Sequence, residues 1–242
     1  DTTYITDLGL DFMRRHRAEH PDTPFFCQIS YVDPHNPYDP PKPYDTLFQA
    51  EDMPDPLPAG WKQEGLRSME KQKALNCHVI REENPAIFKR AAALYHGSIR
   101  FLDDQIMRVI GFLEEQGLAD NTLVVFTTDH GDLMGDHGLM AKFVHYDGSV
   151  RCPLLAWGGG SARGTSDRLV CALDFFPTFC EAAGIPPTSL PPLEGKSFLQ
   201  TCQGGTDADL WEEVAITSMH MQSVVTADGW RLTRYLDEDE GQ

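Results

Sequence analysis

The sequence predicts an α/β fold, a layered sheet with helices on both faces, with a small antiparallel appendage at its C-terminal end. Apolar residues recur at steps of three and four positions from Ile87 to Leu113, which predicts one long helix. The apolar run 122–128 follows it directly and is typical of a strand buried on both faces of a sheet. Near the end, Asp228-Gly229 joins two short strand-like runs and is a strong hairpin signal. A helix that leads into a buried strand is typical of layered α/β domains.

The other elements follow from the same periodicities and from turn residues. A helix is expected from Thr6 to His20, with its start signal at Thr6 and Asp7 and with Pro21 just past its end. An aromatic-rich run over 25–32 predicts a strand, and 40–85 reads as an irregular excursion. We further expect a second buried strand over 152–157, a helix capped by Asp174 that ends at Ala183, and appendage strands over 214–218, 223–227 and 230–235. Residues 1–205 are predicted to form one domain and residues 206–242 the start of a small subdomain.

Composition excludes several classes of protein. The 242 residues carry a formal net charge of −17 and are 41% hydrophobic, which fits a folded chain and excludes a wholly disordered one. So acidic a surface repels phosphate backbones and anionic lipid, so we expect no nucleic-acid partner and no membrane partner. No apolar run is long enough to span a bilayer. Six scattered cysteines without a C-x-x-C pair indicate reduced thiols.

Two loops carry most of the chemistry-bearing residues. The first, 127–145, begins where the buried strand 122–128 ends, which is where α/β sheets bind ligands. Asp129 and His130 offer a carboxylate oxygen and an imidazole nitrogen to a metal: Mn, Zn or Fe suit such donors, and Ca or Mg would need more carboxylates. The alternative is that Asp129 and Asp132 only cap turns in the loop and that His130 is an ordinary surface histidine; the density of Asp, His, Gly and Lys in this run favours the functional interpretation. The second loop follows 25–32 and is stiffened by four prolines, so it holds His35 rigidly.

These segments resemble the sulfatase family of the alkaline-phosphatase-like superfamily. TTDHGDLMGDHGLMAK matches the family signature S/T-D-H/N-G-x-x-x-G-[ED]-H-G with a lysine shortly after, and SYVDPHNPYDPP resembles its Pro-His-x-Pro-[FY] loop. SIRFLDDQIMRVIGFLEEQGLADNTLVVFTTDHGD resembles the long helix that enters the metal strand, and ALDFFPTFCEAAGI the D-x-x-P-T helix. The resemblance implies an alkaline-phosphatase-like layered sheet and a hydrolase of small anionic esters.

The resemblance also assigns roles to individual residues. It implies that Asp129 and His130 are metal ligands, and that Lys142 and His35 contact the sulfuryl or phosphoryl group, His35 also acting at the leaving oxygen. A developing dianion needs such cations and donors. His137 is expected either to orient Lys142 or to pack within its turn, and His145 either to face the anion or to have a structural or rim role. Many members have Asn in place of His130, so Ca²⁺ is implied by the family, whereas the imidazole admits Mn²⁺ or Zn²⁺.

The departures from the family pattern matter as much as the matches. The C/S-x-P-x-R motif, whose Cys or Ser matures to the nucleophilic formylglycine, and two further metal-binding aspartates are not found in this sequence. Because the chain also begins at Asp1 without a signal segment, we expect it to be the C-terminal portion of such an enzyme and to be inactive alone. The sequence does not indicate a cellular compartment. Three other interpretations remain: a phosphonate or phosphate ester hydrolase with the same machinery, a non-catalytic remnant of the fold, and an unrelated acidic α/β domain.

Overall fold

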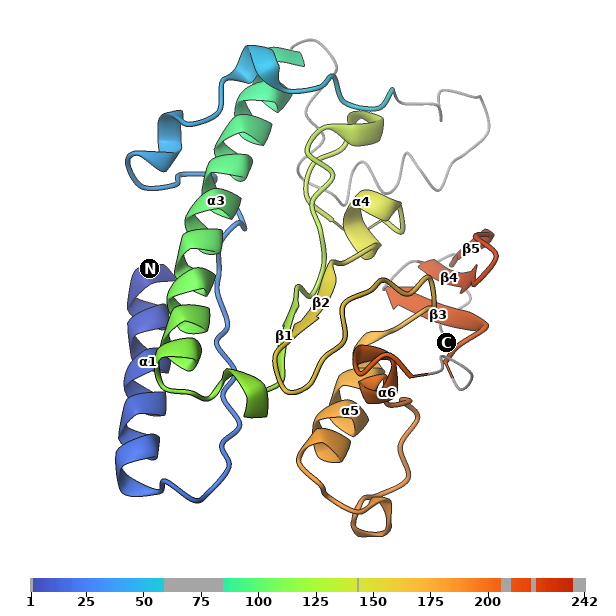
Figure 1. The fold of residues 1–242 in the computed structure, drawn as a ribbon. Helices are drawn as coiled ribbons and strands as arrows, with labels where there is room; N and C mark the ends of the chain where they lie inside the picture. The colour runs from blue at the N-terminus through green and yellow to red at the C-terminus, as the bar shows by residue number, and fades with distance from the viewer. Residues whose placement is uncertain (1, 59–84, 143, 206–209, 219–220, 237–242) are drawn as a thin grey trace. The chain divides into compact units, whose positions relative to one another are not determined.

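The computed structural model describes residues 2–58, 85–142, 144–205, 210–218 and 221–236 (Figure 1). By their contacts these residues divide into two compact units. The described part of the first unit comprises residues 2–58, 85–119 and 134–139, and that of the second comprises 120–133 and the described residues from 140 onward.

Two helices form the core of the first unit. Helix α1 (Thr2–Glu19) packs against the long helix α3 (Pro85–Glu115), as Figure 1 shows. An Arg108 guanidinium nitrogen lies 2.5 Å from an Asp7 carboxylate oxygen and joins the two helices at their rim. The predicted long helix is confirmed. Gly117, just past its end, has a φ of +64°, a left-handed conformation that glycine adopts readily and that commonly ends helices. The buried apolar side chains of the two helices are those of Leu10, Met13, Phe88, Ala93, Phe101, Leu102, Phe112 and Leu113.

The predicted start of the first helix is wrong by four residues. The helix was expected to begin at Thr6, but α1 begins at Thr2 and Thr6 lies fully buried within its second turn. Its hydroxyl donates to the Thr2 carbonyl one turn earlier, at 2.9 Å, and lies 3.0 Å from the Tyr31 hydroxyl. A threonine can satisfy its hydroxyl in this way inside a helix, so its presence is an ambiguous start signal.

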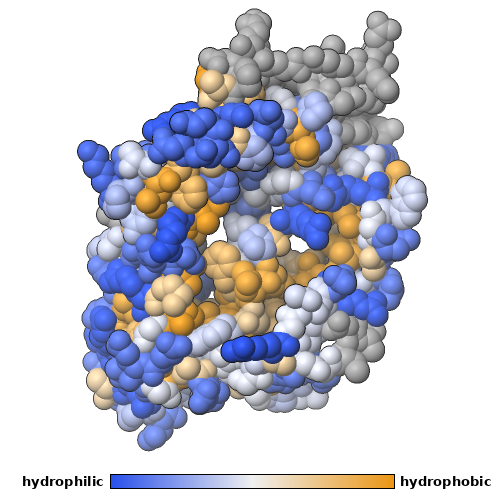
Figure 2. All heavy atoms as spheres, turned by 45° about the horizontal axis from the view of Figure 1, so that its top comes forward, coloured by the Kyte–Doolittle hydropathy of each residue, from blue (hydrophilic) through white to orange (hydrophobic). Residues whose placement is uncertain are grey.

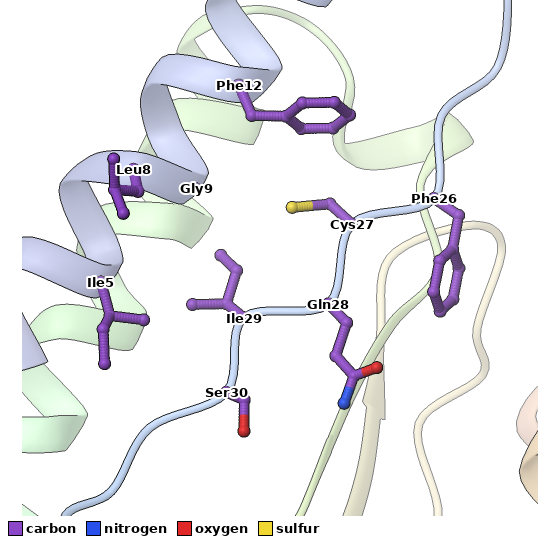
Figure 3. Close-up of a pocket in the computed structure, with 9 residues that line it drawn as sticks. All are labelled: Ile5, Leu8, Gly9, Phe12, Phe26, Cys27, Gln28, Ile29 and Ser30. Carbon is purple, nitrogen blue, oxygen red and sulfur yellow. The ribbon is translucent and has the colours of Figure 1, made fainter.

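The predicted strand over 25–32 is extended but pairs with no strand among the described residues. Its side chains alternate between partly covered and exposed positions, as in a strand with one face packed. Figure 3 shows Cys27 and Ile29 directed at α1, whereas Phe26 and Gln28 point away from it. Packing against α1 thus explains the periodicity, while a ladder would also need a hydrogen-bonding neighbour.

The second unit holds a two-stranded antiparallel sheet of β1 (Val124–Thr127) and β2 (Leu154–Trp157), with Phe126 opposite Leu155. Both predicted strands exist, but neither is buried on both faces as expected. Leu155 is 58% exposed, and apolar residues appear on the molecular surface in Figure 2. Each strand has one hydrogen-bonded partner in the described part of the chain, whereas a strand inside a larger sheet has two.

Helix α5 (Phe175–Ala182) confirms the predicted helix after Asp174, but not the capping role of that carboxylate. Asp174 makes no side-chain hydrogen bond to α5. The third helical position is Pro177, which has no N–H for a cap to accept. The Asp174 carboxylate instead accepts hydrogen bonds from the Cys171 N–H, the Lys196 N–H and the Trp211 indole, at 2.7–3.0 Å.

The C-terminal antiparallel appendage is confirmed. Strands β3 (Glu213–Ser218), β4 (Met221–Thr226) and β5 (Arg231–Tyr235) form a sheet in the order β3-β4-β5. Gly229 has a φ of +93° in the predicted turn between β4 and β5. Met221 and Ser223 on β4 are buried, whereas Gln222 and Val224 between them are exposed, so the sheet has one covered face.

Short helical turns connect these elements. The α-helical ones are α4 (Asp147–Val150) and α6 (Leu199–Cys202). The 3-10 turns are η1 (Tyr44–Thr46), η2 (Ala50–Asp52), η3 (Ala119–Asn121), η4 (Asp136–Gly138), η5 (Ala172–Asp174) and η6 (Pro187–Ser189). Much of the irregular excursion over 40–85 lies outside the described residues. The described cysteines are free thiols, and none of the described helices has the length and hydropathy needed to cross a membrane.

Candidate functional site

Asp129 and His130 stand immediately after β1, where the chain leaves the sheet. The Asp129 side chain is 83% exposed, and its Oδ1 accepts the His130 backbone N–H at 3.0 Å. Its Oδ2 lies 3.5 Å from His130 Nε2. The short hydrogen bond between neighbours turns the carboxylate toward the imidazole, so both side chains face the same side of the loop.

The His130 ring is oriented by its other nitrogen. Nδ1 lies 2.9 Å from the Gly131 carbonyl oxygen, which can only accept, so Nδ1 carries the proton. In the neutral ring, Nε2 then holds the lone pair. The unprotonated nitrogen of an imidazole is the atom that can bind a metal. The backbone carbonyl therefore selects the tautomer that presents a donor atom beside Asp129.

Lys142 completes a cluster of three side chains. Its Nζ lies 2.5 Å from His130 Nε2, and the lysine is partly buried. The ammonium group donates to the Nε2 lone pair, so a metal ion would have to displace this contact to bind the same nitrogen. Of the four residues expected to surround one anion, Asp129, His130 and Lys142 are thus brought together within the second unit.

Backbone contacts hold the two halves of this loop together. The Gly131 N–H donates to the Ser149 carbonyl at 2.8 Å, and the Leu133 N–H donates to the Ala141 carbonyl at 2.9 Å. A Cβ on Gly131 would come within 2.1 Å of the Gly148 carbonyl oxygen, so only glycine allows α4 to approach this closely. The close approach fixes the backbone directly after His130.

The carboxylates nearest to the cluster in sequence serve the backbone. Asp132 Oδ1 accepts the Ala141 N–H at 2.9 Å, and Asp136 Oδ1 accepts the Leu57 N–H at 2.8 Å within the first unit. Asp132 therefore fits the turn-capping interpretation, and Asp136 likewise bonds to the backbone.

His35 belongs to the first unit, in the proline-rich loop after the extended segment. The side chain is exposed, and its Nδ1 lies 2.9 Å from the Asn36 carbonyl oxygen. The Thr2 hydroxyl hydrogen-bonds the Asp33 carboxylate and ties the start of this loop to α1. The loop therefore holds His35 on a fixed backbone, and the convergence of this side chain with Lys142 stays a prediction.

His137 and His145 occupy different settings. His137 lies in η4 of the first unit with a φ of +59°, and its N–H donates to the Leu57 carbonyl at 2.8 Å. His145 is 7% exposed in the second unit, and its Nδ1 lies 2.7 Å from Ser223 Oγ. Burial and the positive charge of Arg231 lower the pKa of His145 below its usual 6.5.

Contacts between this loop and the C-terminal sheet were missed by the sequence analysis. Arg231 Nη1 donates to the His145 carbonyl at 2.6 Å, and its Nη2 pairs with the Asp147 carboxylate. These partners are separated by more than eighty residues and follow no short motif. The one available signal was the mixture of Ser, Thr and Arg at strand positions that also carry apolar residues.

The donor set fits a divalent cation in kind. A carboxylate and an imidazole lone pair lie 3.5 Å apart and face one another, an arrangement that suits Zn²⁺, Mn²⁺ or Ca²⁺. They are two of the four or more donors such ions need. Within the described residues no group of three or more His, Cys, Asp and Glu side chains gathers as a metal site.

The described residues also line an apolar groove of about 380 Å³ in the first unit (Figure 3). It lies between α1 and the extended segment, and the polar side chains among its lining are those of Cys27, Gln28 and Ser30. None of the residues predicted from the sequence to act in catalysis lines it.

Comparison with known proteins decides the family. A family model described as Sulfatase matches residues 1–185. The chain belongs to the sulfatase family. The sulfatase-family chain is 36% identical over 205 residues to an arylsulfatase of Clostridium perfringens, covering 82% of the chain and 42% of that protein. It is 29% identical over 216 residues to human iduronate 2-sulfatase, covering 83% and 39%. The chain thus spans about two fifths of the length of these relatives.

Solved structures agree on the fold. The phosphonate monoester hydrolase of Agrobacterium radiobacter superposes with a TM-score of 0.71 at 22% identity, covering 97% of this sulfatase-family chain and 55% of that one. A sulfatase described as putative, from Bacteroides fragilis, gives 0.68 at 20% identity and covers 93% and 47%. The expected alkaline-phosphatase-like α/β fold is therefore confirmed.

Proposed function

We propose that this chain supplies the C-terminal part of the active site of a sulfuric ester hydrolase. Asp129 and His130 would be two of the ligands of one divalent metal ion, and Lys142 and His35 would act on the sulfuryl group of a small anionic ester. The observation that supports this most is the meeting of Asp129 Oδ2, His130 Nε2 and Lys142 Nζ at the carboxyl end of β1. The relatives named arylsulfatase and iduronate 2-sulfatase support the substrate class.

Lys142 has the clearest role in this proposal. Its ammonium group lies beside the proposed metal ligands, where it attracts a sulfuryl oxygen and stabilises the negative charge that grows as the ester bond breaks. A bound divalent cation would supply further positive charge at the same oxygens. The nucleophile, a formylglycine in the family pattern, would come from outside this sequence.

His35 is proposed to protonate the departing oxygen. An imidazole titrates near neutral pH and can give a proton to the leaving alcohol, which would otherwise depart as an unstable alkoxide. Because Nδ1 hydrogen-bonds the Asn36 carbonyl, Nε2 is the nitrogen proposed to give the proton. His137 is proposed to orient Lys142 or to touch the substrate. His145 is considered below.

A second candidate function keeps the machinery and changes the substrate. An imidazole at position 130, where many family members have Asn, favours hydrolysis of phosphonate or phosphate esters as the alternative. The domain proposal goes with either function: residues 1–205 form part of the catalytic domain, and residues 206–242 begin a small subdomain.

The test is an assay of the full-length protein on p-nitrophenyl sulfate and on a p-nitrophenyl phosphonate, each with Ca²⁺, Mn²⁺ or Zn²⁺ added. We expect the larger kcat/KM on the sulfate ester. Equal or greater activity on the phosphonate would replace the first function by the second. Activity on neither ester would favour the non-catalytic remnant.

A further inference from the structure

The segment that follows Lys142 is buried against the C-terminal sheet. Val144, His145 and Ser149 are each less than 9% exposed, whereas Ala141 and Lys142 before them are partly exposed. Buried irregular backbone must find hydrogen-bonding partners. Polar side chains of β4 and β5 supply two of the contacts to this segment.

The first contact is made by the His145 side chain. Its Nδ1 lies 2.7 Å from Ser223 Oγ, which in turn lies 2.8 Å from Thr233 Oγ1. Ser223 is 2% exposed, so the three polar groups form a buried chain from β5 through β4 to the loop. Buried hydrogen bonds of this kind fix side-chain positions because breaking one leaves a desolvated polar atom.

The second contact is made by Arg231. One guanidinium nitrogen donates to the main-chain carbonyl of His145, and another pairs with the carboxylate of Asp147, the first residue of α4. Through Ser223 and Arg231, the sheet therefore contacts the loop at three places: the His145 side chain, the His145 carbonyl and the first residue of α4.

Helix α4 passes this constraint to the proposed metal ligands. The Ser149 carbonyl accepts the Gly131 N–H, and the Gly148 carbonyl packs so closely that position 131 has no room for a Cβ. Gly131 is the neighbour of His130 and also accepts its Nδ1 proton. On the other side, His145 is three residues from Lys142. The contacts from the sheet thus constrain the backbone near both Lys142 and His130, whose Nζ and Nε2 atoms meet.

A serine beside an imidazole also suggests a nucleophile and its base, but the burial excludes that role. Ser223 Oγ is shared with Thr233 and is closed off from solvent, so no ester can reach it. The pair can act only through the loop that it holds.

We propose that His145, Ser223 and Arg231 are positioning residues: through them the C-terminal sheet holds Lys142 at the geometry that binds a tetrahedral oxyanion. The kinetic part of this inference rests on the proposed function. The binding part does not, because inorganic sulfate can be titrated without turnover.

The experiment compares Ser223→Ala, His145→Leu and His145→Asn in the full-length protein, with Gln222→Ala as the matched control. Gln222 is the neighbour of Ser223 on the exposed face of β4. The measurements are the Kd for inorganic sulfate by calorimetry, kcat and KM, and the melting temperature of each variant.

We expect Ser223→Ala and His145→Leu to raise the sulfate Kd and the KM about tenfold, of the size seen when groups that orient ligands are removed. Gln222→Ala should match the wild type. An asparagine amide can donate or accept near the place of Nδ1, so His145→Asn should recover the affinity to within about threefold.

Three results would overturn the proposal: an unchanged sulfate Kd in Ser223→Ala and His145→Leu, a loss that merely follows the unfolded fraction while Kd and KM stay constant, or no recovery in His145→Asn. If the wild type binds sulfate but hydrolyses no ester, the proposed function fails while the Kd comparison still decides the positioning role. If it does neither, both fail.

Discussion

Two aspartates of the second unit show opposite uses of a carboxylate. Asp174 is fully buried, and its two oxygens accept hydrogen bonds from two backbone N–H groups and an indole N–H. Asp129 is 83% exposed at the end of β1, and its carboxylate contacts the adjacent Thr128 and His130. A buried carboxylate surrounded by donors stabilises the fold, whereas we propose that the exposed one beside an imidazole serves as a ligand for a cation. The same residue type therefore separates structure from function by its surroundings.

The same substitution at both sites tests whether the two aspartates have different roles. Asp174→Asn replaces an acceptor oxygen by an NH₂ group that faces N–H donors, and each buried donor left unsatisfied costs about 1–3 kcal/mol. We expect the free energy of unfolding to fall by about 3 kcal/mol or more. Asp129→Asn should leave it unchanged. Denaturant unfolding of both variants measures this, and equal losses would contradict the assignment of the two roles.

Removal of the lysine charge tests the functional side of the comparison. Lys142→Ala should lower kcat/KM of the full-length protein about 10²- to 10³-fold, because one preorganised donor to the developing charge is lost. The melting temperature should stay the same. Lys89→Ala, which breaks a surface ion pair with Asp55, is the control and should keep full activity. A Lys142→Ala variant with wild-type kcat/KM would remove the lysine from the site.

The pH dependence of stability separates His145 from the exposed side chains of the loop. Burial and Arg231 lower the pKa of His145, so below about pH 6.5 the unfolded chain binds a proton that the folded chain resists. The free energy of unfolding must then decrease as the pH falls from 6.5 toward the folded pKa, with no contribution above about pH 7.5.

Denaturation of wild type and His145→Asn between pH 5 and 8 measures this difference. The variant should lose less stability on acidification than the wild type. Parallel curves for the two proteins would show that His145 titrates alike in the folded and unfolded states.

The smallest expected effect lies at a thiol near the loop. Burial raises the pKa of Cys152, and the negative charge of Asp129 raises that pKa further. Asp129→Asn should therefore speed the alkylation of Cys152 by iodoacetamide at pH 8, because more thiolate is present. Cys171, whose pKa is raised mainly by burial, should react at its wild-type rate. Mass spectrometry of the tryptic peptides follows both rates, and an unchanged Cys152 rate would place Asp129 too far away to matter.

Local patterns were enough to predict much of the fold. The long helix α3, the helix after Asp174 and the Asp228-Gly229 hairpin each depend on residues close together in the sequence, and all three are present. The start of α1 was misplaced because a threonine hydroxyl can bond to its own helix. The segment 25–32 is extended, as predicted, but it pairs with no strand among the described residues. Its alternating pattern reflects packing on α1, whereas strand pairing also needs a hydrogen-bonding partner strand.

The candidate site was predicted in kind but not in its supports. Asp129, His130 and Lys142 lie within fourteen residues, so a motif could reveal them, and the structure brings their side chains together. Ser223 and Arg231 reach the loop from more than seventy residues away, and no local signal marks such contacts. Asp174 was noticed only as a helix cap, since two of its partners, Lys196 and Trp211, lie 22 and 37 residues away.

Metal titration of the full-length protein tests the central claim most directly. Wild type, Asp129→Asn and Asp174→Asn are each titrated with Ca²⁺, Mn²⁺ and Zn²⁺ by calorimetry, at a temperature where every variant is folded. The account predicts one site per chain in wild type and in Asp174→Asn, and an affinity at least about a hundredfold weaker in Asp129→Asn, which lacks a direct ligand. Undiminished metal affinity in Asp129→Asn would contradict it.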